Sequence, residues 1–141
     1  MNTTNTQVIT LFCLTTDGPV YIDKPSLETV MHAVGSLDGR DTDTVSLNLG
    51  NGDSMDIGGG ADGMYKCHAR TMSSFYDLLN PLVQQDMSDT MDVQMNDESN
   101  TFPRCTIVSL DMAKSAVECF CVNGDLHAQL HWDNSLEYEP L

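Results

Sequence analysis

Residues 44–57 read TVSLNLGNGDSMDI, and this stretch decides the fold. Apolar and polar side chains alternate over 44–49, which is the period of a half-buried strand. The dipeptide Asn51-Gly52 follows in a glycine-rich turn, and such pairs tolerate the positive φ angles of a tight hairpin. A second short strand then returns at Met55-Asp56-Ile57. The stretch therefore predicts an antiparallel hairpin.

Further strands are expected on both sides of this hairpin, because β-branched, aromatic or alternating residues recur between turn signals. Segment 74–85 is ambiguous, since its leucines have helical spacing while Pro81 limits or breaks a helix. Segments 91–95 and 104–108 are expected to pair across the polar loop 96–101. The other expected strands are 8–14, 20–22, 64–70 and 126–132.

Two amphipathic helices are expected, at 26–38 and 110–122. Ser26 is the expected N-cap of the first, and Ser109 or Asp111 that of the second. Because both helices carry apolar stripes, they need a surface on which to pack. We therefore expect an α+β fold, a mainly antiparallel β-sheet with two principal helices packed on it. The stripes are Leu27/Val30/Met31/Val34 and Ala113/Ala116/Val117/Phe120, and Trp132 is expected to be partly buried near Phe120.

The chain has 141 residues, which predicts a single domain over 1–141 with flexible ends at 1–7 and 134–141. Its polar start carries no Lys or Arg, and no stretch approaches the roughly 20 apolar residues of a membrane span. Its five cysteines, an odd number, are typical of reduced cytosolic thiols. We expect a soluble cytoplasmic protein without a disulfide.

The charge is strongly acidic: 21 Asp and Glu against 6 Lys and Arg give a net charge of −15. Nucleic acids and anionic membrane surfaces would repel such a chain, so neither is expected as a partner. The same field attracts basic proteins and accelerates their approach. The composition therefore favours a basic protein partner, and mimicry of a nucleic acid stays open.

No pattern in the chain is typical of a metal, cofactor or catalytic site. The glycine triplet at 58–60 lacks the Gly-Lys-Ser/Thr of a phosphate-binding loop. His127 and His131 on one strand would lie roughly 13 Å apart, too far for one metal ion. Cys119 and Cys121 have no second cysteine pair and are expected as small buried hydrophobes. We therefore expect no cofactor, no metal and no enzymatic activity.

The distribution of the acidic residues is more informative than their number. Five of them fall within 86–98, a run without Lys or Arg, and others occupy the hairpin turn and the glycine loop. A solvated surface that keeps the protein soluble explains such a pattern equally well, and an apolar patch around Met55, Met64 or Phe75 is a rival binding surface. The predicted partner-binding residues are Asp53, Asp56, Asp62, Asp86, Asp89, Asp92, Asp97 and Glu98.

The C-terminal third carries a recognisable pattern. Residues 107–120 read IVSLDMAKSAVECF, followed by Asn123-Gly124-Asp125 and Leu130-His131-Trp132. Together with LNLGNGD at 47–53 and MDIG at 55–58, this resembles the first-numbered bacterial immunity-protein (Imm) family. Members have a second aromatic residue where Cys119 or Cys121 stands here.

The resemblance implies a protein that neutralises a toxin domain of a polymorphic toxin system, often a nucleic-acid deaminase or nuclease. Such proteins are not enzymes, and they block the active site or substrate cleft of the toxin. A nucleic-acid-binding cleft is basic, so an acidic inhibitor fits it. Two other classes stay open: a small acidic secretion chaperone or adaptor, and a small enzyme, for which no motif is present.

Overall fold

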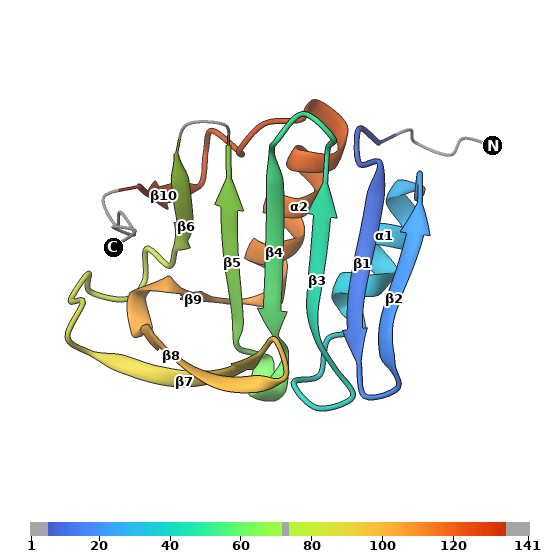
Figure 1. Ribbon diagram of the computed structural model, residues 1–141. Coiled ribbons are helices and arrows are strands. Elements are labelled where there is room, and N and C mark those ends of the chain that lie inside the picture. Colours follow the sequence, from blue (N-terminus) through green and yellow to red (C-terminus); the bar gives the residue numbers. More distant parts are fainter. Residues whose placement is uncertain (1–5, 72–73, 135–141) are drawn as a thin grey trace.

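An eight-stranded sheet forms the centre of the protein, and the computed structural model describes residues 6–71 and 74–134 (Figure 1). Neighbouring strands follow the order β10-β6-β5-β4-β3-β1-β2, β9 pairs with β5, and every pairing is antiparallel. This confirms the expected mainly antiparallel α+β fold. The strands are β1 (Thr10–Thr15), β2 (Gly18–Asp23), β3 (Thr42–Asn48), β4 (Ser54–Gly59), β5 (Tyr65–Arg70), β6 (Phe75–Leu79), β9 (Ile107–Val108) and β10 (His131–Asp133).

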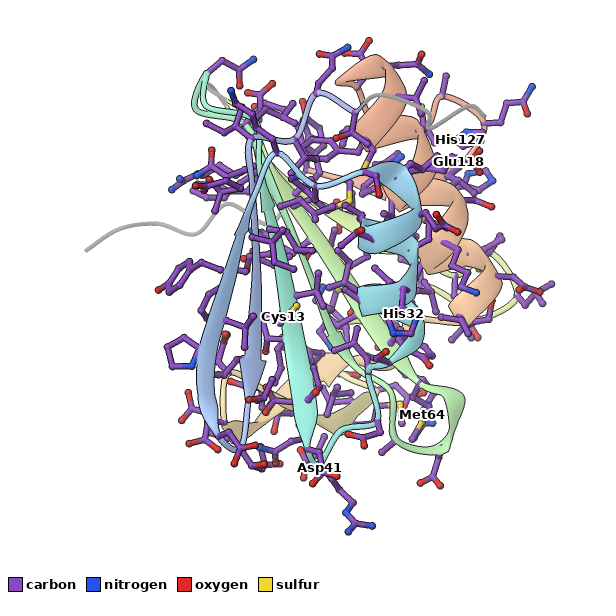
Figure 2. The ribbon with its side chains drawn as sticks, turned by 90° about the vertical axis from the view of Figure 1, so that its right-hand side faces the viewer. Cys13, His32, Asp41, Met64, Glu118 and His127 are labelled. Atoms are coloured by element: carbon purple, nitrogen blue, oxygen red, sulfur yellow. The ribbon has the colours of Figure 1, made fainter. Side chains whose placement is uncertain are left out.

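Two helices, α1 (Leu27–Gly35) and α2 (Leu110–Asn123), cover one face of this sheet (Figure 2). Their caps are those expected: Ser26 Oγ accepts from the Thr29 N–H, and Ser109 Oγ accepts from the Met112 N–H. Gly124 follows α2 at φ 73°, the left-handed conformation that ends helices. The first helix ends at Gly35 instead of residue 38, because the chain turns there to enter β3.

Strand alternation divides the side chains between two faces. Leu47, Met55, Ile57 and Cys67 belong to the buried core between the sheet and the helices. Their neighbours in sequence lie on the opposite side, which we call the open face. Trp132 is half-buried and packs against the core cluster that includes Phe120, as expected.

A second hairpin, β7 (Thr90–Met95) and β8 (Glu98–Pro103), crosses the open face near one end of the sheet (Figure 1). The predicted partner of 91–95 was therefore wrong: the strand pairs with 98–103, and residues 104–106 form the short helix η2 (Arg104–Thr106). Asn96 and Asp97 have φ angles of 58° and 64°. Positive φ at both central residues defines a two-residue type I′ turn, for which Asn and Asp are suitable residues.

The structure decides one question that the sequence left open and corrects one prediction. The ambiguous segment 74–85 contains the strand β6 instead of a helix, and Leu82 is fully solvent-exposed, so its leucines share no buried face. The final strand is short, because residues 126–130 form a turn that places His127 before the strand instead of on it. The Leu130 N–H and Trp132 Nε1–H both donate to the His127 carbonyl oxygen and close this turn.

Two residues of the predicted flexible N-terminal end, Thr6 and Gln7, form hydrogen bonds with the rest of the fold. Thr6 Oγ1 donates to the Pro25 carbonyl oxygen, and the Gln7 N–H donates to that of Cys121. The other residues of the predicted flexible ends, apart from Asn134, lie outside the described residues. Within residues 6–71 and 74–134, neither helix has the length and apolar character needed to cross a bilayer.

Candidate protein-docking surface and polar pocket

Four turns lie together at the end of the sheet that the β7–β8 hairpin crosses (Figure 1). They join β1 to β2, α1 to β3, β4 to β5 through the short helix η1 (Ala61–Gly63), and β7 to β8. Their sequence contains one basic residue, Arg40. The turns carry six exposed carboxylates, which we call the acidic end: Asp17, Asp38, Asp41, Asp62, Asp97 and Glu98. Figure 2 shows Asp41 at this end, far from Glu118 and His127.

Backbone hydrogen bonds fix two of these turns. Asp38 Oδ1 accepts from the N–H groups of Arg40, Asp41 and Thr42, at 2.9, 2.9 and 3.1 Å. These backbone donors lower the pKa of Asp38, because they stabilise the ionised carboxylate. The Thr16 N–H donates to the Asp41 carbonyl oxygen, so the β1–β2 turn is joined to the same loop.

The buried carboxylate of Asp43 holds the hairpin tip against β3. Asp43 Oδ2 accepts from the Asp97 N–H at 2.8 Å and from Gln94 Nε2 at 3.2 Å. The neighbouring Thr44 Oγ1 accepts from the Asn96 N–H at 2.7 Å. Because these bonds orient the tip, Asp97 and Glu98 project beside the other turns of the acidic end.

The structure brings together only part of the predicted binding set. Asp62, Asp97 and Glu98 lie at the acidic end. Asp53 lies in the β3–β4 turn at the opposite end of the sheet, so it does not share their surface (Figure 1). Asp56 is half-buried on the open face of β4.

The remaining three predicted residues have local partners. Asp86 Oδ1 accepts from the Ser88 hydroxyl and N–H, and these bonds lower the pKa of Asp86. Asp89 forms an ion pair with Arg104, with 3.3 Å between Oδ1 and Nε, and both side chains are about half exposed. Asp92 Oδ1 accepts from the Thr101 hydroxyl across the hairpin. All three are solvent-exposed, but none of them lies on the four turns of the acidic end.

A row of ionisable residues crosses the open face in strict register. Asp56 of β4 pairs with His68 of β5, His68 pairs with Asp77 of β6, and Asp77 pairs with Asp133 of β10. Residues directly opposite each other on antiparallel strands have side chains in contact distance. We call these four residues the polar row. Asp77 and Asp133 are both buried.

Lys66 supplies the compensating charge for this row. Its Nζ lies 2.6 Å from Asp77 Oδ1, and His68 Nδ1 donates to the same oxygen at 3.0 Å. Burial alone would raise the pKa of Asp77, but the His68 hydrogen bond and the Lys66 ammonium outweigh it and lower that pKa. The Phe102 ring of β8 covers Lys66, with its centroid 5.1 Å from Nζ. The ion pair is therefore enclosed between the sheet and the hairpin.

A cavity of about 200 Å³ lies beside this ion pair. Its walls come from the open face of β4 and β5 on one side and from the β7–β8 hairpin on the other. We call it the polar pocket, and it is lined by Asp56, Lys66, His68, Met95, Asn96, Asn100 and Phe102.

The part of the chain that the structure describes contains no metal-binding cluster and no disulfide. No three His, Cys, Asp or Glu side chains come together there in an arrangement that could hold a metal ion. All five cysteines are free thiols. Burial raises the pKa of Cys67 and of Cys121 to about 12, so both stay protonated at neutral pH. Cys119 is half-exposed instead of buried, which corrects part of the expectation for the Cys-x-Cys pair.

An apolar binding surface around Met55 is excluded because that side chain is buried, whereas one around Met64 or Phe75, which are partly exposed, stays a prediction. Met55 is fully buried under the helices, whereas Phe75 lies on the open face, where its ring stacks on His68 at 5.8 Å between centroids. These residues therefore lie on opposite sides of the sheet.

Sequence reasoning missed the residues that surround the ion pair. Lys66 and His68 alternate with Cys67 and Ala69 in a correctly predicted strand, so the alternation contained the signal that both face away from the core. Asp77 could not be placed, because its segment was ambiguous between helix and strand.

Comparisons of the chain with protein-family models, curated proteins and solved structures found no match.

Proposed function

We propose that this protein is an immunity protein that binds a bacterial toxin domain and blocks its basic substrate cleft. The observation that carries the proposal is the acidic end, where four turns present six exposed carboxylates beside a single arginine. A toxin domain that acts on a nucleic acid needs a cationic cleft to hold the phosphates. Carboxylates on projecting turns can occupy the same cationic positions. The resemblance of 107–132 to the Imm family supports the same function.

The turns are suited to this role because their shape is set before binding. Asp38 and Asp43 hold their loops through hydrogen bonds to backbone N–H groups. A preorganised surface loses less conformational entropy when it binds. In this proposal the protein acts in the cytoplasm by stoichiometric binding, with no reaction of its own, no cofactor and no nucleic-acid partner.

The proposal is tested with the toxin domain encoded next to this gene. Expression of that domain alone should stop bacterial growth, and co-expression of this chain should restore it. The purified proteins should form a stable complex, and the chain should inhibit the toxin stoichiometrically. Restored growth without a complex contradicts the proposal. A neighbouring gene for a non-toxic secreted substrate that the chain binds would instead favour the chaperone alternative.

A further inference from the structure

The polar pocket is lined by one carboxylate, that of Asp56, and no described side chain forms an ion pair with it. Lys66 Nζ lies 2.6 Å from Asp77 Oδ1, and Lys66 is only 4% exposed, so the Lys66 charge is balanced by the Asp77 carboxylate. Asp56 lines the pocket one strand away and is half-buried. The pocket therefore favours a cationic occupant over an anionic one.

The hairpin side of the pocket adds a hydrogen-bond acceptor. Asn100 Nδ2 donates to the carbonyl oxygens of Met95 and Glu98, at 2.8 and 3.2 Å. Because both of its N–H donors serve the hairpin, the amide oxygen is the polar atom that Asn100 offers a ligand. Asp56 and Asn100 thus supply acceptors from opposite walls.

The remaining walls are suited to an apolar stem. Phe102 contributes an aromatic ring and Met95 a flexible thioether. The volume of about 200 Å³ is below the roughly 300–1,000 Å³ that is typical of small-molecule sites. It is closer in size to one side chain than to a cofactor.

We propose that the polar pocket receives one arginine side chain of the basic protein partner. The guanidinium donates to Asp56 and to the Asn100 amide oxygen, and its stem lies along Phe102 and Met95. A planar group with several fixed donors matches acceptors that stand on different walls better than a lysine ammonium does. This inference rests on the proposed function for the source of the arginine, and it adds a specific anchor on the open face beside the acidic end.

The first experiment measures the affinity of the partner. Asp56→Asn removes the charge with an isosteric side chain, and it should weaken binding of the neighbouring toxin domain by about 30-fold or more. Glu118→Gln is the matched control, because it removes the same charge from the exposed side of α2 (Figure 2). That variant should change the affinity less than about 2-fold. Unchanged amide spectra away from β4 and the hairpin verify that Asp56→Asn is folded.

The second experiment uses N-acetyl-L-arginine methylamide as a probe of the pocket. It should produce saturable NMR shifts in the side-chain amides of Asn96 and Asn100, and these shifts should disappear in Asp56→Asn. The neutral citrulline analogue should produce none. Equal shifts with the lysine analogue, or shifts that persist in Asp56→Asn, overturn the assignment to arginine.

The two proposals fail differently. If the wild-type chain binds the toxin and Asp56→Asn binds it as tightly as Glu118→Gln does, the arginine pocket is wrong and the proposed function stands. If the wild-type chain binds no toxin while the probe shifts the pocket signals, the proposed function is wrong and the guanidinium chemistry of the pocket stands. If neither ligand binds, both proposals are overturned.

Discussion

Lys66 and Asp77 form an ion pair inside the protein, with 2.6 Å between Nζ and Oδ1 and side chains 5% and 2% exposed. Removing two charges from water is costly, and their attraction offsets that cost only when the geometry is good and further hydrogen bonds are made. Here His68 supplies a further bond to the same carboxylate. The pair lies where the β7–β8 hairpin meets the sheet, so it couples the packing of the hairpin to the polar row.

Removing Lys66 should destabilise the protein strongly. Lys66→Ala leaves the Asp77 charge buried with its main partner missing, and we expect the free energy of unfolding to fall by about 3–5 kcal/mol. Lys24→Ala removes the same charge from an exposed position and should change it by less than about 0.5 kcal/mol. Urea denaturation monitored by Trp132 fluorescence measures both. Similar losses for the two variants would show that the ion pair is not important for stability.

The stability that depends on Asp77 should be lost in acid. Folding lowers the pKa of Asp77, so its contribution is complete above the unfolded-state value of about 3.9 and is lost as the pH falls through the lower folded-state value. Asp77→Asn should be less stable than the wild type at pH 7, and the difference should shrink between about pH 5 and pH 2. Unfolding free energies of both proteins across this range test it. If the difference in unfolding free energy between the two proteins grows on acidification, folding does not lower the pKa of Asp77.

The elements predicted correctly are those whose signals are local. Ser26, Ser109 and Gly124 are capping residues that act within one helical turn, and the Asn51-Gly52 turn fixes its own hairpin. Segment 74–85 stayed ambiguous because Phe75 and Leu82 have helical spacing, whereas pairing with β5 and β10 makes its first part a strand. Tertiary context outweighed the local pattern there.

In the candidate site, too, features with local signals were predicted and features that depend on strand pairing were not. Acidic turns were visible in the sequence, so Asp62 and Asp97 were correctly placed on exposed turns, whereas Glu98 begins the strand β8. Their meeting at one end depends on strand order, which a single sequence does not specify. The polar row needs the register of four strands. Two of its members lie where the sequence was least clear: Asp77 on β6, whose segment was ambiguous, and Asp133 on β10, which begins later than predicted.

The packing of η1 against the α1–β3 loop depends on Gly60. A Cβ atom at Gly60 would overlap the Leu37 carbonyl oxygen, and its φ of 109° is itself strained for other residues. Gly60→Ala should therefore lower the free energy of unfolding by about 3 kcal/mol or more. Gly63→Ala is the matched control, because its φ is 71° but nothing lies within 4 Å of the added atom, and about 1 kcal/mol is expected. Equal losses in urea denaturation would rule out close packing as the cause.

The acidic end should control how fast the toxin domain associates. We compare the triple variant Asp62→Asn/Asp97→Asn/Glu98→Gln with a control triple, Asp53→Asn/Glu118→Gln/Asp125→Asn, which removes the same three charges elsewhere. Asn tolerates the positive φ angles of positions 62 and 97, so the turns should keep their shape.

At about 50 mM salt the acidic-end triple should associate about 10-fold more slowly than the wild type, because the lost charges no longer steer the encounter. The control triple should change the association rate less than about 2-fold. At about 500 mM salt, screening shortens the range of these charges several-fold, so the association rates of the three proteins should become similar. Stopped-flow association with the toxin domain measures all of these rates. If both triples slow association equally, the total charge of the chain speeds the encounter and the acidic end has no special role in it. If neither triple slows it, the acidic residues serve solubility instead of docking.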